Sequence, residues 1–189
     1  SAASDVYKRQ TVFMAFGEVT CMIFGGLSPA FTKWVGSKRM AFFWSALLCL
    51  VLSIAFFFIP MSPDYIWVMI AFVILTSIGI GIYSPLMWSM YADVADYHTE
   101  HFGTSATGLI FSSGTMSQKF GTAISGSLIA LFLGWAGANM ITDKMGNTVI
   151  DPTSITDSVL MMVWSLFSLF PAVIAFLLMV LSYKFPIKK

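Results

Sequence analysis

The stretch YIWVMIAFVILTSIGIGIYSPLMWSMY, residues 65–91, contains no charged side chain. A helix needs about 20 predominantly apolar residues to cross the hydrocarbon core of a bilayer, and this stretch is long enough. Four other segments are similarly apolar, although some of them contain isolated charges. The sequence therefore predicts an all-α integral membrane protein with five transmembrane helices, at residues 11–34, 40–59, 65–91, 107–137 and 159–183.

Composition agrees with a membrane protein and excludes several other classes. Of the 189 residues, 58% are hydrophobic and only 10% are charged. A soluble domain carries about 25% charged residues, so this chain lacks the side chains to cover a water-facing surface. The net charge of +1 gives no electrostatic basis for binding nucleic acid. Residues 1–10 are polar and lack the apolar core of a signal peptide, so we expect a non-native or truncated leader before a bundle at 11–189.

The basic residues predict the orientation, because Lys and Arg concentrate in cytoplasmic loops. The alternation of the five spans places most of them on one side of the membrane, and only Lys144 and the two basic residues of the leader on the other. We therefore expect a multi-pass protein of the cell membrane with a cytoplasmic carboxyl terminus, which also contacts membrane lipid. The basic residues on the predicted inner side are Lys33, Lys38, Arg39, Lys184, Lys188 and Lys189.

Lys119 lies within the fourth span, where a charge is costly. An ammonium group at the bilayer centre costs about 2.5 to 3.5 kcal/mol on insertion scales, so such residues usually face a protein interior or a polar path. Helical spacing places Ser112, Thr115 and Thr122 on the same face. Close helix packing explains small residues on that face but not the lysine. We therefore predict that these four residues line a substrate or cation path.

A second polar stripe follows the third span. It includes Ser84 and Trp88, and Pro85 should kink the helix between them. Trp88 or Tyr83 offers a flat aromatic face for a sugar ring, although aromatic residues in membrane helices also serve as packing or interface anchors. Glu18, in the first span, either reaches the outer interface or faces the same cavity as Lys119.

Two carboxylates at the end of the third span, Asp93 and Asp96, share one helical face and precede Tyr97. Three interpretations apply to this segment. The carboxylates could bind a metal in a membrane-embedded enzyme, the segment could be a solvated helix end, or the carboxylates could act as gating residues that pair with cytoplasmic Lys or Arg. The composition of the segment alone leaves these alternatives open.

The segments YADVADY (residues 91–97), ATGLIFSS (106–113) and TMSQKFG (115–121) resemble the signature of the glycoside-pentoside-hexuronide:cation symporters. That family includes the melibiose carriers and belongs to the major facilitator superfamily. The resemblance implies a twelve-helix carrier in two bundles, of which this chain supplies helices eight to twelve. It places Lys119 in the sugar and cation pathway, and Asp93, Asp96 and Tyr97 at the inner end of helix ten.

The resemblance also implies a mechanism and partners. A sugar or glycoside and a coupling cation, Na⁺ or H⁺, would bind together while the two bundles alternate their access. No cofactor, metal or catalytic residue is expected, and the partner of this bundle is the missing amino-terminal half. Relatives carry basic residues where this chain has Glu100 to Phe102 and Gly103 to Ser105. This loop therefore lacks the cations that would pair with Asp93 or Asp96.

Three alternatives to a sugar symporter remain. The first is a major facilitator carrier for another small solute. The second is the metal-dependent enzyme, which requires Asp93, Asp96 and the neighbouring histidines within coordination distance. The third is a structural membrane subunit, in which Lys119 would pack against Glu18.

Overall fold

The computed structural model describes residues 2–59, 65–142 and 148–185. Five long helices are present, as the hydropathy of the sequence predicts. They are α1 (Ala2–Val35), α2 (Lys38–Phe57), α3 (Ile66–Phe102), α4 (Thr107–Trp135) and α5 (Asp157–Lys184). Helix α1 begins within the polar leader and continues into the first span without interruption. The origin of residues 1–10 stays a prediction.

Three of the helices are long and apolar enough to cross a membrane by length and composition alone. In the described part of the chain, these are α2, α5 and the Trp67–Phe102 part of α3. Helix α4 does not reach the same apolarity, and it carries Lys119 together with many Gly, Ser and Thr residues. Helix α4 is therefore less suited than these three helices to contact lipid on every side.

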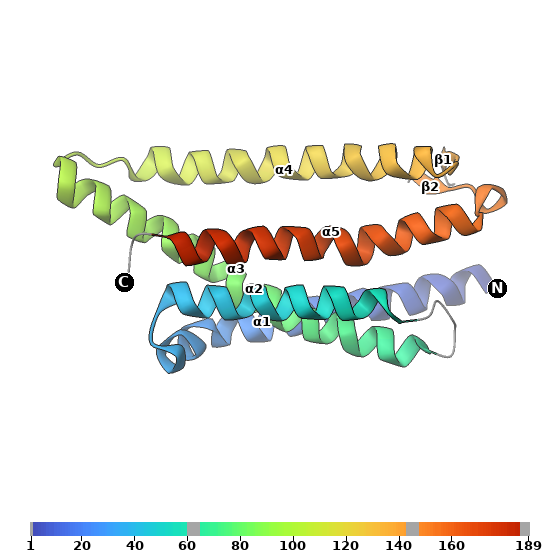
Figure 1. The fold of residues 1–189 in the computed structure, drawn as a ribbon, viewed down its shortest axis with the longest axis horizontal. Coiled ribbons are helices and arrows are strands. Elements are labelled where there is room, and N and C mark those ends of the chain that lie inside the picture. Colours follow the sequence, from blue (N-terminus) through green and yellow to red (C-terminus); the bar gives the residue numbers. More distant parts are fainter. Residues whose placement is uncertain (1, 60–64, 143–147, 186–189) are drawn as a thin grey trace.

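Helix α3 runs obliquely through the bundle and links the other elements (Figure 1). It packs against α1 and α2 over much of its length and approaches α4 with its second half. A core at the α1–α2–α3 junction is built on the buried residues Ala41, Phe42, Ile82 and Leu86. The helix continues well past the expected span to Phe102, and Gly103, with φ of 67°, ends it in the left-handed conformation that favours glycine. Residues 93–101 therefore form a helical extension, as the length of this segment predicts.

Helices α1 and α3 approach each other closely enough for backbone contact. A Cβ atom on Gly81 would lie 2.6 Å from the carbonyl oxygen of Cys21. Further along the same interface, the buried Ser28 hydroxyl donates a hydrogen bond of 3.0 Å to the Ile82 carbonyl. The absence of a side chain on Gly81 thus sets the separation of the two helices.

This contact makes a prediction for substitutions of glycine. Gly81→Ala should lower the free energy of unfolding by about 1 to 2 kcal/mol, because overpacking forces the backbones apart. The matched control is Gly26→Ala in α1, where a Cβ meets nothing within 4 Å. Thermal unfolding of the purified carrier in detergent measures both. Equal midpoints for the two variants would contradict the proposed steric role of Gly81.

Helices α2 and α5 form the most extensive helix pair. Phe56 stacks on Trp164 with ring centroids 4.6 Å apart. The indole Nε1 of Trp164 also donates a 3.2 Å hydrogen bond to the Phe57 carbonyl. Because both contacts lie at the end of α2, they hold the amino-terminal half of α5 against it.

The connection between α4 and α5 contains a small hairpin that the hydropathy pattern does not predict. Strands β1 (Met140–Thr142) and β2 (Thr148–Ile150) pair antiparallel. A short turn of 3₁₀ helix, η2 (Pro152–Ser154), follows them. The main-chain N–H and the hydroxyl of Thr153 donate to the Asp151 carboxylate, and these bonds lower the pKa of Asp151 below its usual value. Lys144 lies outside the described residues.

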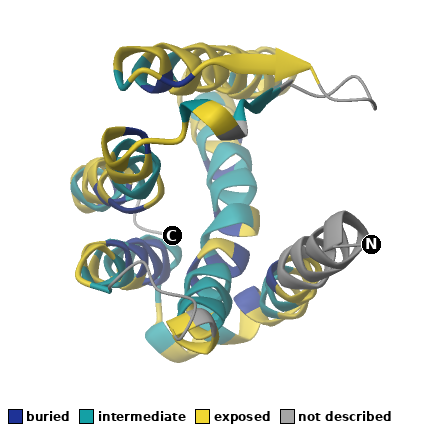
Figure 2. Cartoon of the chain, turned by 90° about the vertical axis from the view of Figure 1, so that its right-hand side faces the viewer, coloured by how far each residue is buried: buried dark blue, intermediate teal, exposed yellow. Residues whose placement is uncertain are grey.

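Helix α4 stands apart from the rest of the bundle. It runs along one edge, and its surface is exposed over most of its length (Figure 2). Its contacts with α3 and α5 are sparse compared with those that α3 makes with α1 and α2. Leu133, near its end, is the buried residue of this helix and joins a small cluster with Val159 of α5. The helix that carries Lys119 is thus the least packed of the five long helices that the structure describes.

Candidate functional site

Lys119 lies near the middle of α4 and is exposed. Among the described residues, none forms a hydrogen bond or an ion pair with its ammonium group. Glu18 is also exposed, on α1, and does not contact it. The arrangement in which Lys119 packs against Glu18 in a tight core is therefore not observed. Lys119 instead presents its charge on an uncovered helix face.

The hydroxyl residues near Lys119 are satisfied within their own helix. Ser112 donates to the Leu109 carbonyl, and Thr115 donates to the Phe111 carbonyl at 2.9 Å. Thr122 donates to the Gln118 carbonyl at 2.9 Å. All three residues are exposed on α4. Each hydroxyl oxygen keeps a lone pair free to accept another hydrogen bond, so this face combines a cationic donor with several acceptors.

A groove lies between α1 and α3 and has a volume of about 380 Å³. Glu18 of α1 lines it, together with Gly81, Ser84, Pro85 and Trp88 of α3. The groove therefore contains most of the polar stripe that the sequence predicts on the third span. Lys119 does not line it. The structure thus divides the predicted site residues into two groups on different helices.

Trp88 connects the two groups. Its indole lines the groove and also lies parallel to the ring of Phe111 on α4, at 6.2 Å with an interplanar angle of 11°. Tyr91 contacts both rings edge-on, and its ring fills the space beside Gly114. This aromatic cluster is the principal described contact between α3 and α4. Sequence reasoning did not single out Phe111, because an aromatic residue in an apolar run carries no signal of its partner.

Tyr83 has a different environment from Ser84 and Trp88. Its ring packs on Phe42 of α2 with centroids 5.6 Å apart, at the edge of the α1–α2–α3 core. It does not line the groove. The sugar-stacking role of Tyr83 stays a prediction. In the structure, its side chain packs helix α3 against helix α2.

Asp93 is held by a lysine from the neighbouring helix. The Lys38 Nζ atom lies 2.8 Å from both carboxylate oxygens, while the Asp93 side chain is only 12% exposed. Lys38 is the first residue of α2 and follows a turn at Gly36, whose φ is 85°. A bidentate, largely buried ion pair therefore joins the start of α2 to the second half of α3.

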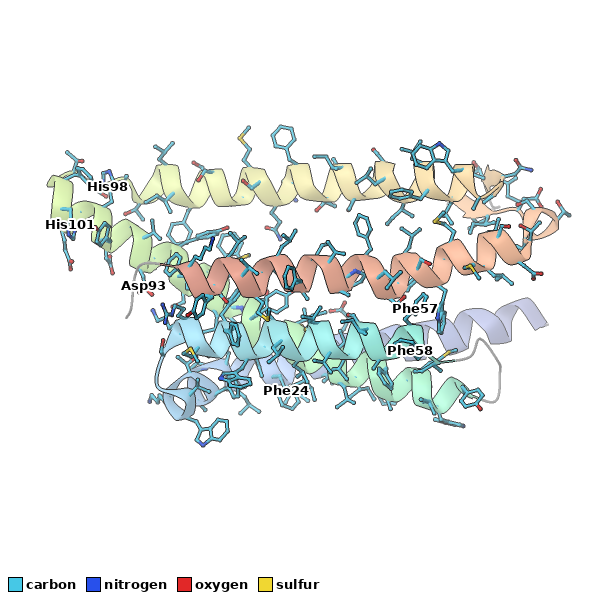
Figure 3. The ribbon with its side chains drawn as sticks, viewed as in Figure 1. Phe24, Phe57, Phe58, Asp93, His98 and His101 are labelled. Atoms are coloured by element: carbon cyan, nitrogen blue, oxygen red, sulfur yellow. The ribbon has the colours of Figure 1, made fainter. Side chains whose placement is uncertain are left out.

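The remaining residues of this segment lie further along α3. Asp93, His98 and His101 follow one another towards the turn into α4 (Figure 3). Asp96 is exposed, and Tyr97 stacks on His101 at 3.9 Å. Within residues 2–59, 65–142 and 148–185, no group of three His, Cys, Asp or Glu side chains is placed to hold a metal ion. The geometry therefore gives no support to a metal-dependent enzyme at Asp93 and Asp96.

Comparison with known sequences agrees with this arrangement of apolar helices and polar faces. The profile of the MFS/sugar transport protein family matches residues 5–189. The chain belongs to this family. It is accordingly a part of a multi-pass membrane protein of the transporter type, with helices equivalent to a portion of the major facilitator fold.

Individual relatives point the same way. The chain is 31% identical over 129 residues to the inner membrane symporter YicJ of Escherichia coli, an alignment that covers 67% of the chain and 27% of YicJ. It is 30% identical over 125 residues to the putative glycoside/cation symporter YagG of the same organism, covering 66% and 26%. A third relative, the glucuronide carrier protein homolog of Escherichia coli, is 36% identical over 63 residues, covering 33% and 14%.

These alignments also define the extent of the chain. The matched region amounts to about a quarter of the length of YicJ and of YagG. No solved structure matches the chain significantly. Because the alignments leave about three quarters of YicJ and of YagG unmatched, the activity of a complete carrier is a matter for proposal.

Proposed function

We propose that this chain is the carboxyl-terminal part of a sugar:cation symporter that works by alternating access. A glycoside, pentoside or hexuronide would enter with Na⁺ or H⁺, and the missing amino-terminal half would complete the binding site. The protein would reside in the cell membrane with its carboxyl terminus in the cytoplasm. The similarity to two proteins named as symporters supports the transport type, and the gathering of Lys33, Lys38, Arg39 and Lys184 at one end of the bundle supports the orientation.

The observation that carries the proposal is the exposed cation on α4. An ammonium group in a lipid-spanning helix is costly unless it faces protein or water. The described bundle leaves the Lys119 face uncovered. We infer that the missing half covers it and that substrate passes between the two, with Lys119 donating hydrogen bonds to sugar hydroxyls or pairing with a carboxylate of that half. Ser112, Thr115 and Thr122 would line the same path.

At the inner end, we propose that Asp93 and Asp96 act as gating residues. The Lys38–Asp93 pair represents one state of this gate, while the exposed Asp96 is free to meet another cation as the halves move. Because relatives' basic residues are absent from the loop after Phe102, Lys38 supplies the cation instead. Tyr97, stacked on His101, would border this region.

Uptake of radiolabelled sugars by the complete carrier in proteoliposomes tests the proposed function. An imposed inward Na⁺ or H⁺ gradient should drive accumulation of at least one neutral or acidic sugar above the level without a gradient. Liposomes without protein are the control. Uptake that is indifferent to both gradients would show a facilitator rather than a symporter, and no uptake of any sugar would favour a carrier for another solute.

A further inference from the structure

Building on this function, we propose that Glu18 is a specificity residue that makes the α1–α3 groove select neutral sugars over hexuronides. The groove would bind part of the transported glycoside, with its sugar ring on Trp88 and its hydroxyl groups directed at Glu18 and Ser84.

The lining of the groove carries one negative charge. Glu18 is the only charged side chain among the described residues that line the groove. A carboxylate accepts hydrogen bonds from pairs of sugar hydroxyls. It repels a ligand carboxylate, because like charges placed together in a site are unfavourable. The groove is therefore suited to an uncharged sugar.

The polar groups of the groove are available to a ligand. The Glu18 carboxylate and the Ser84 hydroxyl make no hydrogen bond with any described residue. Most serine and threonine side chains on α4 instead donate to their own helix, as Ser112 and Thr122 do. Pro85 has no N–H, so the Gly81 carbonyl loses its usual helical donor. These groups give the groove both acceptors and a hydroxyl donor without breaking an existing bond.

The α1 and α3 backbones approach each other closely at the glycines of the groove. The Gly81 carbonyl oxygen lies 3.5 Å from the position that a Cβ atom on Gly25 would take. The Trp88 indole stands in the groove opposite the α1 side, and the contact with Phe111 fixes its orientation. Aromatic faces with nearby hydrogen-bonding groups suit amphipathic ligands such as sugars, which carry apolar C–H patches.

The position of Glu18 along α1 determines its expected depth in the membrane. Glu18 precedes Lys33 at the basic end of α1 by fifteen residues, or about 22 Å at the rise of an α-helix. The hydrocarbon core is about 30 Å thick, which places the carboxylate inside it rather than in the headgroup region. An ionisable group at that depth is by default a functional residue with a polar neighbour. A sugar bound in the groove would be the polar neighbour of Glu18.

The test uses the complete carrier and matched pairs of substrates. Glucose and glucuronate, and galactose and galacturonate, are presented as the same methyl glycosides, so that each pair differs only by oxidation of the hydroxymethyl group to a carboxylate. Transport or direct binding of each compound gives a neutral-to-uronate preference. We expect the wild type to favour the neutral member by about tenfold or more, corresponding to about 1.4 kcal/mol.

The variants then locate the origin of the preference. Glu18→Gln keeps the size and hydrogen bonding of the side chain but removes its charge, and should reduce the preference to near unity. Glu18→Asp keeps the charge and should retain it. Trp88→Phe should weaken both members of a pair similarly. A wild type that prefers uronates, or a preference unchanged in Glu18→Gln, would overturn the inference while leaving sugar symport intact. Absence of transport and binding for every sugar would refute the symporter function itself.

Discussion

Replacing Lys119 by alanine in the complete carrier should reduce cation-coupled sugar uptake about 100-fold at sub-saturating sugar, with expression unchanged. Hydrogen bonds to a charged group contribute about 1.5 to 3 kcal/mol, and a loss near the upper end corresponds to this factor. The effect should appear in uptake rather than in folding, because Lys119 is exposed and its ammonium group makes no hydrogen bond or ion pair with the described residues.

Lys119→Arg is the matched control for charge. It keeps the cation and several donors in a larger, planar group, so it should retain more uptake than alanine if the ammonium group pairs with a carboxylate. Met116→Ala, one turn earlier on the exposed surface of α4, controls for a general effect of truncating this helix. Full coupled uptake by Lys119→Ala at normal expression would remove Lys119 from the proposed pathway.

The second large effect is expected at the Lys38–Asp93 pair. Lys38→Ala leaves a carboxylate that is only 12% exposed without its cation. Breaking a fully buried pair costs about 3 to 5 kcal/mol, and partial exposure of Lys38 reduces this to about 2 to 3 kcal/mol. Thermal unfolding of the purified carrier should show this loss.

A double-mutant cycle separates the pair from its surroundings. Lys38→Ala combined with Asp93→Ala should recover part of the stability, because neither charge is then left alone. Arg39→Ala, at the next position and also basic, should have a much smaller effect. If the effects of Lys38→Ala and Asp93→Ala on the unfolding midpoint add up in the double variant, the pair does not hold α2 against α3. If the pair also gates the carrier, Lys38→Ala should change the rate of sugar exchange between its two faces as well as the stability.

The sequence predicts the helices well because membrane spanning imposes a strong length and apolarity constraint. The extension of α3 beyond Tyr91 follows from the length of its segment in the same way. Details that depend on pairing between distant residues are less predictable. The hairpin at Met140–Thr142 and Thr148–Ile150 arises from two three-residue strands, which are too short to leave a periodic pattern.

In the candidate site too, groupings within one helix are predictable from the sequence, whereas contacts between helices are not. Spacing along one helix groups Ser84 and Trp88, and the structure shows that both line one groove. It does not reveal that Glu18 from α1 lines the same groove, nor that Lys38 rather than another basic residue meets Asp93. Both associations depend on how the helices cross, and the crossing geometry cannot be predicted from the spacing of residues in a single sequence. Tyr83 directly precedes Ser84 in the sequence but does not line the groove. Its ring packs instead on Phe42 at the edge of the α1–α2–α3 core.

The polarity of α4 has a consequence for how the protein is made. A segment less apolar than α2, α3 and α5 partitions poorly from the translocation machinery into lipid by itself. During synthesis, α4 must be retained beside other helices until its polar face around Lys119 is covered. A cell that produces this chain alone should therefore degrade it, so the polarity of α4 also acts as a checkpoint for assembly.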